Sequence, residues 1–322
     1  MPSAQASAVS GEERRMDISV VVPTYKSSGF IGELVTRLEA TLAAISGSYE
    51  IILIDDCSPD ETWSALTALR ETRPGTLRII RLMKNAGQHN AILCGFGYAN
   101  GDIVVTMDDD LQHPPEEVPK LVAAVRNGQD IAIGAYDEKR HAGYRNVAGS
   151  MVDGVIRGLY NLPRDFQLTS FRAVRGPLAR AARDSNSPYP YVTCILFDQA
   201  SRVTNVPVSH MPRHVGESSY SLVRSALLAI NLVFSYSSLP LYGAIILCGL
   251  MFLLSVSVFG WIVISTLMFG VTVPGWASTI AVMTFFSSVI LGSLAVIGVY
   301  VGRTHQQLTG RRRPFLVDEA VL

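Results

Sequence analysis

The feature that most constrains this chain is a long stretch without charged side chains. From Ser225 to Gly302 the sequence contains no Asp, Glu, Lys, Arg or His, and soluble domains rarely contain such a stretch. Prolines divide it into pieces, and two of these exceed the roughly 20 apolar residues that a helix needs to cross a bilayer. We therefore expect a transmembrane helical hairpin at 240–302, with spans at about 241–268 and 277–302. The alternative is a hairpin buried in a soluble protein, which the uncharged length disfavours.

The residues before the hairpin predict a helix that lies on the membrane surface. Leu222, Ala226, Ile230 and Phe234 recur at helical spacing, opposite small polar residues. This pattern predicts an interfacial amphipathic helix at 216–239.

Arginines on both sides of the hairpin predict its orientation. Arg224 precedes it, and Arg303 and Arg311 to Arg313 follow it. The positive-inside rule places both ends in the cytoplasm. We expect residues 303–322 to be a cytoplasmic basic tail, and the chain to be a multi-pass protein of the cell inner membrane with its large polar part in the cytoplasm.

Composition excludes several classes of protein. Lys+Arg and Asp+Glu number 27 each, so there is no overall positive field that would attract nucleic acid. The four cysteines show no CxxC spacing, which disfavours a zinc site or a disulfide framework and fits a reducing compartment. Residues 1–17 are polar and contain no apolar segment, so we expect a disordered tail and not a signal peptide.

Upstream of the apolar stretch, short β-rich runs alternate with helical patterns. Strands are expected at 18–22, 50–54, 77–82, 103–107 and 130–133, and helices at 30–45, 62–72, 88–99 and 115–127. This alternation favours an α/β fold with a doubly wound, mostly parallel sheet, whose ligand site lies beyond the carboxyl ends of the strands. We expect this domain to cover residues 18–215.

Polar residues follow three of the expected strands. They are Pro23, Thr24 and Tyr25 after the first, Asp55 and Asp56 after the second, and Asp108, Asp109 and Asp110 after the fourth. Three successive carboxylates repel one another unless a cation or hydrogen-bond donors compensate. Mg²⁺ is usually held by one or two carboxylates together with substrate phosphates, so the pattern suggests a nucleoside diphosphate that a metal bridges to Asp108 and Asp110. The alternative is a solvated acidic turn before the next helix. No strand is followed by GxGxxG or P-loop spacing.

Several motifs give the chain a resemblance to a known family. They are VVPTY at 21–25, ILIDDCSPD at 52–60, NAGQHNAILCGF at 85–96, GDIVVTMDDDLQHPPEEVPKLV at 101–122, DFQLTSFRA at 165–173 and RHVGESSYS at 213–221. With the paired apolar spans, they resemble glycosyltransferase family 2, of the GT-A fold. Within it the chain is similar to the polyisoprenyl-phosphate glycosyltransferases, which include dolichyl-phosphate mannose synthases and the bacterial undecaprenyl-phosphate transferases for glucose and aminoarabinose.

The resemblance implies a role for individual residues. It implies nucleotide-sugar contacts for Pro23, Thr24, Tyr25, Asp56, Asp108 and Asp109; metal contacts for Asp108, Asp110 and Gln112; catalytic roles for Asp165 and Arg213; and acceptor or phosphate contacts for Arg145, Arg213 and Ser219. It also implies Mg²⁺ or Mn²⁺ as cofactor. Without the resemblance, Asp165 would be interpreted as a helix N-cap or a loop hydrogen bond, and the two arginines as surface groups near acidic lipid headgroups.

Two positions depart from the family pattern. Where the family usually has PxYNE after the first strand, this chain has Lys26 and Ser27 in place of the last two residues, so an acid is lost and a cation is gained. Where many relatives have a lysine in GxSKY, this chain has Ser219.

The resemblance implies an activity and its partners. The expected reaction is the inverting transfer of a sugar from a nucleotide-sugar, expected to be a UDP-sugar, to a polyprenyl phosphate at the cytoplasmic membrane face, for cell-envelope glycan modification. The expected partners are these two substrates, membrane lipid and further copies of the chain in a homo-oligomer of up to four. Two alternatives stay open: a transferase that acts on a lipid-linked sugar, and a catalytically silent membrane scaffold.

Overall fold

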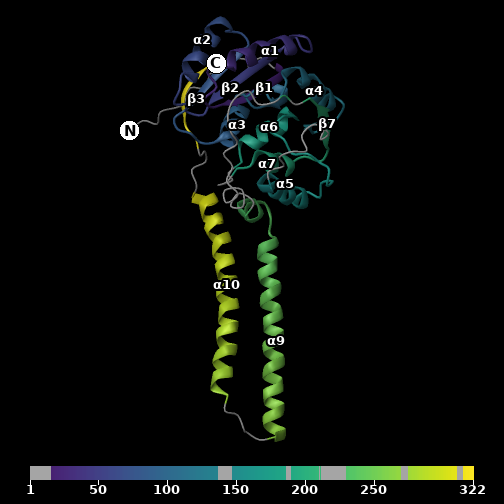
Figure 1. Ribbon diagram of the computed structural model, residues 1–322, viewed down its shortest axis with the longest axis vertical. Helices are drawn as coiled ribbons and strands as arrows, with labels where there is room; N and C mark the ends of the chain where they lie inside the picture. The colour runs from purple at the N-terminus through teal and green to yellow at the C-terminus, as the bar shows by residue number, and fades with distance from the viewer. Residues whose placement is uncertain are drawn as a thin grey trace, which may run out of the picture.

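A mixed β-sheet forms the centre of the polar domain in the computed structural model (Figure 1). The structure describes residues 16–136, 147–185, 190–209, 211, 230–269, 275–309 and 315–322. Within these ranges the strands are β1 (Met16–Thr24), β2 (Tyr49–Asp55), β3 (Leu77–Leu82), β4 (Gly101–Thr106), β5 (Ile131–Tyr136), β6 (Arg172–Arg175), β7 (Val203–Val208) and β8 (Val317–Val321). Their order across the sheet is β7-β5-β6-β4-β1-β2-β3-β8.

The middle of the sheet is parallel, as the alternating pattern predicts. β1 pairs in parallel with both β2 and β4, and β2 pairs in parallel with β3. The sheet as a whole is mixed, however, because β6 runs antiparallel to both β4 and β5, and β8 runs antiparallel to β3. β5 pairs in parallel with β7, and because both are reversed relative to β6 they run in the same direction as the central strands. The expectation of a mostly parallel sheet therefore holds, with β6 and β8 as the two antiparallel strands among those described.

Helices cover both faces of the sheet. They are α1 (Ile31–Ala43), α2 (Thr62–Thr72), α3 (Gln88–Phe96), α4 (Val118–Arg126, preceded by the 3-10 turn η1, Pro115–Glu117), α5 (Val147–Leu159), α6 (Gly176–Arg183) and α7 (Val192–Phe197). Side chains of β1 alternate between two buried clusters: Val20 and Val22 lie with Leu34 of α1, whereas Val21 lies with Ala91 of α3. This two-residue period is what a strand with both faces covered requires.

Helix α3 packs closely against the sheet and begins near the edge where the polar residues lie. A Cβ atom added to Gly95 would lie 2.4 Å from Val21 Cγ1, so glycine lets α3 approach the sheet there. The helix begins after Gly87, whose φ of 86° lies in the left-handed region that favours glycine. The chain can therefore turn sharply from the end of β3 into α3.

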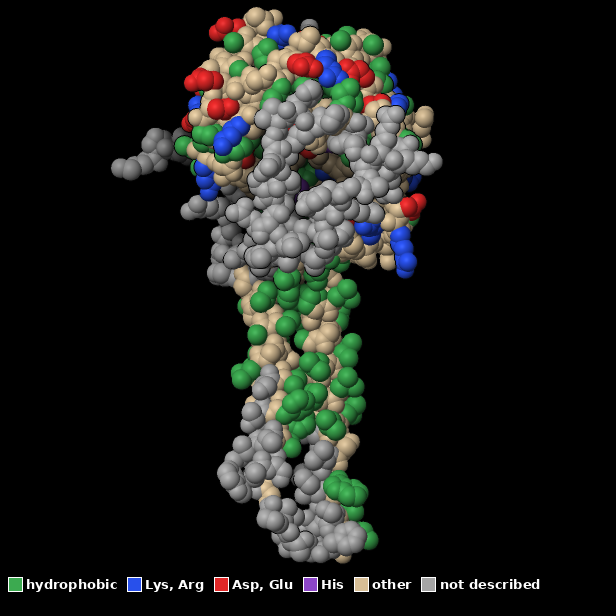
Figure 2. Space-filling view, viewed as in Figure 1, with side chains coloured by type: hydrophobic (Ala, Val, Ile, Leu, Met, Phe, Trp, Pro, Cys, Tyr) green, Lys and Arg blue, Asp and Glu red, His purple; other side chains and the backbone are tan. Residues whose placement is uncertain are grey.

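Two long helices extend from this domain side by side, α9 (Leu239–Phe269) and α10 (Trp276–Thr309) (Figure 1). Cys248 Sγ lies 3.0 Å from Ser293 Oγ across their contact. Large apolar side chains point outward, including Leu253 (63% exposed), Trp261 (72%) and Leu267 (81%). Figure 2 shows the same division on one face: charged side chains lie over the domain, and apolar side chains cover the paired helices.

Length and apolarity single out one described helix segment that could cross a membrane, Phe285–Gly302 in α10. A second segment would qualify only if the short helix Ile230–Tyr236 and Leu239–Met251, which meet at 84°, counted as one span. The expected interfacial helix at 216–239 lies mostly outside the described residues. In its described part, Leu232 is buried in the cluster that α3 shares, whereas Ile230 is 52% exposed.

After α10 the chain returns to the sheet. β8 pairs with β3 through Ile79–Val321 and Ile80–Ala320, and Met83 N–H donates to the Leu316 carbonyl at 2.9 Å. Phe315 is 8% exposed and belongs to the same buried cluster as Leu82. Part of the expected basic tail at 303–322 is therefore a strand of the sheet, which its short run with two acidic residues, VDEAV, does not indicate in the sequence.

Candidate active site

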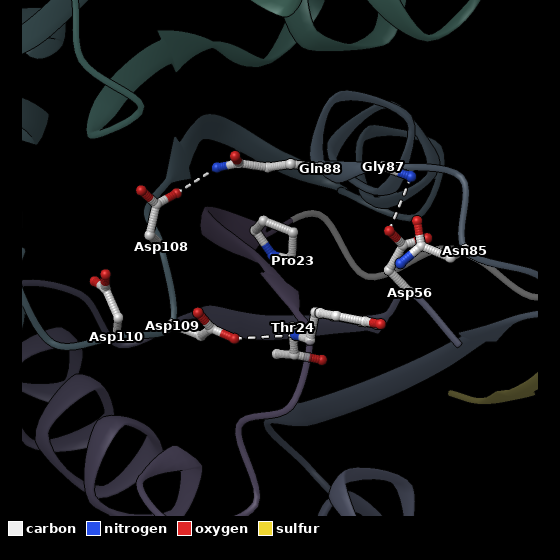
Figure 3. A pocket seen from close by; sticks show the side chains of 10 residues that line it. Pro23, Thr24, Asp56, Asn85, Gly87, Gln88, Asp108, Asp109 and Asp110 are labelled. Carbon is white, nitrogen blue, oxygen red and sulfur yellow. Dashed lines mark hydrogen bonds between the residues drawn. The ribbon is translucent and has the colours of Figure 1, made fainter. Parts of the chain in front are cut away.

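A pocket opens where the central strands end. Its wall consists of Pro23, Thr24, Tyr25, Asp56, Asn85, Gly87, Gln88, Asp108, Asp109 and Asp110, and its volume is about 310 Å³ (Figure 3). The volume lies at the lower end of the range for small-molecule sites. The pocket thus brings together all six residues expected to contact a nucleotide-sugar, together with Asp110. These roles stay predictions.

Asp56 joins the end of β2 to the start of α3. Its Oδ1 accepts from Ala86 N–H at 2.7 Å, and its Oδ2 accepts from Gly87 N–H at 2.8 Å. Burial raises the pKa of Asp56, although both backbone bonds favour the charged form and lower it. This carboxylate therefore shapes the Asn85–Gln88 wall of the pocket, in addition to any contact with a ligand.

Asp108 is held in place by two neutral side chains. Gln88 Nε2 donates to its Oδ1 at 2.6 Å, and Ser170 Oγ donates to its Oδ2 at 2.6 Å. Gln88 opens α3 and Ser170 lies just before β6, so three distant segments meet at this carboxylate. Such bonds restrict the rotamer of Asp108 and preorganise it for a ligand.

Asp109 faces the end of β1. Its Oδ2 accepts from Tyr25 N–H at 3.1 Å and also from the Ser27 hydroxyl. Burial raises the pKa of Asp109 to about 6; both hydrogen bonds lower it, and the neighbouring Asp108 and Asp110 raise it further. The Asp109 carboxylate thus has hydrogen-bond donors within the protein, at the end of β1.

Asp110 closes the turn that follows β4. Its Oδ1 accepts from Gln112 N–H at 3.2 Å, and Leu111 between them has a φ of 60°. The Gln112 carbonyl accepts from Met211 N–H at 3.1 Å. This contact brings Met211, which follows β7, to the edge of the turn.

The carboxylates suit a hard divalent cation only if a substrate completes the shell. Within the residues that the structure describes, no three His, Cys, Asp or Glu side chains lie close enough to hold a metal by themselves. Asp108 and Asp110 supply hard oxygen donors at one strand end, and Mg²⁺ typically takes one or two carboxylates plus substrate phosphates. The residues present therefore fit a Mg²⁺ or Mn²⁺ site that a bound diphosphate completes.

A buried aromatic group backs the acidic turn. The His113 ring stacks on Tyr136 and Phe171, with centroids 6.0 and 5.1 Å apart. Burial raises the pKa of Tyr136, and the charges of Asp108 and Asp110 raise it further. Gln167 fixes Tyr136 by accepting from its N–H (2.8 Å) and donating to its carbonyl (2.9 Å). The DFQLTSF motif therefore supports the site through Gln167.

The other predicted site residues are not on the pocket wall. Gln112 is partly exposed in the adjacent turn, and Asp165 is exposed in the turn between α5 and β6. Arg145, Arg213 and Ser219 lie outside the described residues, as do 1–15 of the expected tail and Arg311 to Arg313.

Four further residues that line the pocket or hold its side chains are not among the predicted site residues: Asn85, Gly87, Gln88 and Ser170. The first three lie in NAGQHN and follow β3 at the same sheet edge as the other polar residues. The strand-end rule, applied to the third strand as it was to the first, second and fourth, would have found them. Ser170 carries no comparable signal, because its contact with Asp108 depends on the antiparallel strand β6.

Solved structures share this architecture. The chain matches glucosyl-3-phosphoglycerate synthase from Mycobacterium tuberculosis, solved with Mn²⁺, UDP and phosphoglyceric acid, with a TM-score of 0.52 and 18% identity over 68% of this chain and 77% of the other. It matches mannosyl-3-phosphoglycerate synthase from Rubrobacter xylanophilus with a TM-score of 0.50 and 17% identity, covering 69% and 73%. At these identities the likeness concerns the fold, which is that of the GT-A glycosyltransferases.

The sequence comparison is more specific. Residues 19–201 match the family described as Glycosyl transferase family 2, and the chain belongs to this family. It is 30% identical, over 93% of its length, to the undecaprenyl-phosphate 4-deoxy-4-formamido-L-arabinose transferases of Klebsiella pneumoniae and Edwardsiella ictaluri, covering 92% and 93% of these relatives. The resemblance inferred from the motifs is confirmed.

Proposed function

We propose that this glycosyltransferase transfers a sugar from a nucleotide-sugar, with a UDP-sugar as the first expectation, to a polyprenyl phosphate. The observation that carries the proposal is the reach of the likeness to undecaprenyl-phosphate sugar transferases, which spans 93% of the chain and so extends beyond the domain into α9 and α10. If the similarity were confined to the polar domain, it would not indicate which acceptor the enzyme uses.

The proposed chemistry uses positioning and charge more than proton transfer. A polyprenyl phosphate is already an anion at neutral pH, so its oxygen barely needs a general base, and the site has to align it with the anomeric carbon. Attack on that carbon inverts its configuration. Asp108, fixed by Gln88 and Ser170, and Asp110 would hold Mg²⁺ or Mn²⁺, which when bound neutralises the leaving diphosphate. Asp165 would orient the acceptor or the sugar.

We further propose that α9 and α10 form a transmembrane hairpin in the inner membrane, with the catalytic domain in the cytoplasm. Their outward apolar side chains support this, as does β8, because its pairing with β3 returns the chain after α10 to the sheet that precedes α9. Tags at both termini should then be protected from protease added outside sealed cells. Cleavage of a C-terminal tag from outside would contradict this topology.

The helices also offer a surface for a homo-oligomer of up to four chains. Ser293 faces α9, whereas Gly292 and Gly298 are exposed, and added Cβ atoms there would meet nothing within 4 Å. Small residues let membrane helices approach closely. A monomeric mass in mild detergent would contradict this proposal.

A donor screen with undecaprenyl phosphate tests the activity. We expect one nucleotide-sugar to give a lipid-extractable sugar product that requires Mg²⁺ or Mn²⁺ and is absent with undecaprenol, which has no phosphate. A product formed only from a lipid-linked sugar would favour the alternative acceptor. No turnover of any donor would favour a silent scaffold.

A further inference from the structure

The turn Tyr25–Ser27 at the end of β1 is fastened by side chains from distant segments. Lys26 N–H donates to Ser58 Oγ at 3.1 Å, and Ser27 N–H donates to Thr62 Oγ1 at 2.9 Å. Asp109 accepts from Tyr25 N–H at 3.1 Å and from the Ser27 hydroxyl. Each of the three backbone N–H groups therefore has a side-chain acceptor outside the turn.

Asp109 is the charged member of these anchors, and it differs from its two neighbours in direction. In Figure 3 its carboxylate points toward the end of β1, whereas the Asp110 carboxylate points away from it. Bonds to an ionised acceptor are stronger than bonds between neutral groups. Asp109 is thus the anchor whose loss should loosen the turn most.

The fastened turn puts Lys26 in an unusual place. Its φ of 59° is uncommon for a residue other than glycine, and such outliers gather at functional sites. Its ammonium lies 5.4 Å from the centroid of the Tyr25 ring, which is 45% exposed and lines the pocket. A cation therefore stands beside a pocket whose wall carries four aspartates.

We propose that Asp109 is a positioning residue and not a metal ligand: it holds the Tyr25–Ser27 turn so that Lys26 and Tyr25 together contact the nucleoside diphosphate of the donor. This rests on the proposed function. The carboxylate that the family pattern usually has at position 27 is supplied here from position 109, across the Ser27–Asp109 hydrogen bond. The two departures at Lys26 and Ser27 then belong to one arrangement.

Binding measurements on the full chain in detergent separate this role from metal binding. The probes are UDP at saturating Mn²⁺ and Mn²⁺ at saturating UDP. Asp109→Asn should raise the UDP Kd about ten-fold, the loss of roughly one hydrogen bond to a charged group, and leave the Mn²⁺ midpoint unchanged. Asp110→Asn is the matched control and should shift the Mn²⁺ midpoint by about ten-fold or more.

Three further variants test the same arrangement if Asp109→Asn folds poorly. Ser27→Ala should raise the UDP Kd in the same direction. Lys26→Asn, which tolerates the same backbone conformation, should raise the Kd and weaken its dependence on salt. The exchange Ser27→Asp with Asp109→Ser should bring the UDP Kd back to within about three-fold of wild type, because it puts the carboxylate on the other side of the same bond.

Each outcome decides. A Mn²⁺ midpoint that Asp109→Asn shifts as much as Asp110→Asn does would make Asp109 a metal ligand and overturn the inference. If the wild-type chain binds UDP tightly, and neither Asp109→Asn nor Ser27→Ala changes the UDP Kd, this inference is overturned but the proposed function stands. If the wild-type chain binds neither UDP nor GDP with Mn²⁺, the proposed function fails, and the inference fails with it.

Discussion

The catalytic domain and the helical pair use apolar residues in opposite ways. In the domain, strands such as β1 bury both faces, and polar groups at the strand ends are bonded to one another. In α9 and α10, large apolar residues such as Leu253 and Trp261 lie on the outside. The difference teaches that one chain is adapted to two solvents, water around the sheet and, on our proposal, lipid around the helices.

The largest effect should come from the strand ends, where the domain concentrates charge. Asp110→Asn should lower turnover by about a hundred-fold to a thousand-fold, because on the proposed function this carboxylate would hold the cation. The fold should stay intact, because the side chain is partly exposed. Product formation and circular dichroism measure the two effects. Undiminished turnover in excess chelator would contradict the metal role.

The comparison also predicts which solvent surrounds the residues that follow α10. Phe315→Ala should destabilise the catalytic domain by about 3 kcal/mol, because the ring is buried in the core of the domain and a cavity would remain. Thermal unfolding measures this. Leu322→Ala, at a 59% exposed position, is the control. Equal melting temperatures for both variants would mean that β8 does not belong to the domain.

A matched pair of lysines compares the two solvents directly. Leu253 in α9 and Leu316 before β8 are 63% and 66% exposed. Leu253→Lys should cost about 2.5 to 3.5 kcal/mol of membrane insertion and reduce the fraction that resists alkaline extraction. Leu316→Lys should cost nearly nothing, because that side chain faces water. Identical extraction of the two variants would show that α9 does not lie in lipid.

The stability of the domain should depend on pH through Asp130. The hydrogen bond from Arg202 lowers the pKa of Asp130 to about 2, and the bond from Arg175 adds to this. Because the folded pKa lies below the ordinary value of 3.8, the pair stabilises the fold above about pH 4, and this stability is lost as the pH falls toward 2.

Melting temperatures measured between pH 2 and pH 5 test this. Asp130→Asn should make the melting temperature depend less on pH in this range. Glu71→Gln, at an exposed site on α2, should leave that dependence unchanged. An unchanged pH dependence in Asp130→Asn would contradict the assignment.

The smallest effect should come from the contact between the helices. Ser293→Ala removes the partner of Cys248 and should cost roughly 0.6 kcal/mol, the average for such contacts in membranes. Gly243→Ala, where an added Cβ meets nothing within 4 Å, is the control. A loss of several kcal/mol in Ser293→Ala would mean that polar contacts, and not apolar packing, hold the pair together.

The sequence predicted the central strands because short runs rich in Ile and Val alternate there with helical patterns. It missed β6, β7 and β8. β6 and β8 have four and five residues and include charged side chains, β7 contains Asn205 and Pro207, and all three pair with strands distant in the sequence. The edge carrying Pro23, Asp56 and Asp108 followed from topology alone, since parallel strands place their carboxyl ends together.

The direction in which each carboxylate of the acidic triplet points could not be predicted. Asp108, Asp109 and Asp110 are chemically identical in the sequence, and what separates them is the direction in which each carboxylate points. That direction depends on Gln88, Ser27 and Gln112, and for the first two the partner is brought there by the tertiary fold.

The pairing of β8 with β3 also restricts motion. A domain joined to a membrane anchor by one connection could swing about it and sample many heights and tilts. Here a second connection, which follows α10, ends in the same sheet, so any rotation that pulls on one connection is resisted by the other. The domain and the helices are thus joined at two places in the chain, and both connections lead to the same sheet. Two connections restrict the distance between the pocket and the helix ends more than one would. On our proposal, an acceptor confined to the membrane plane would then search two dimensions instead of three.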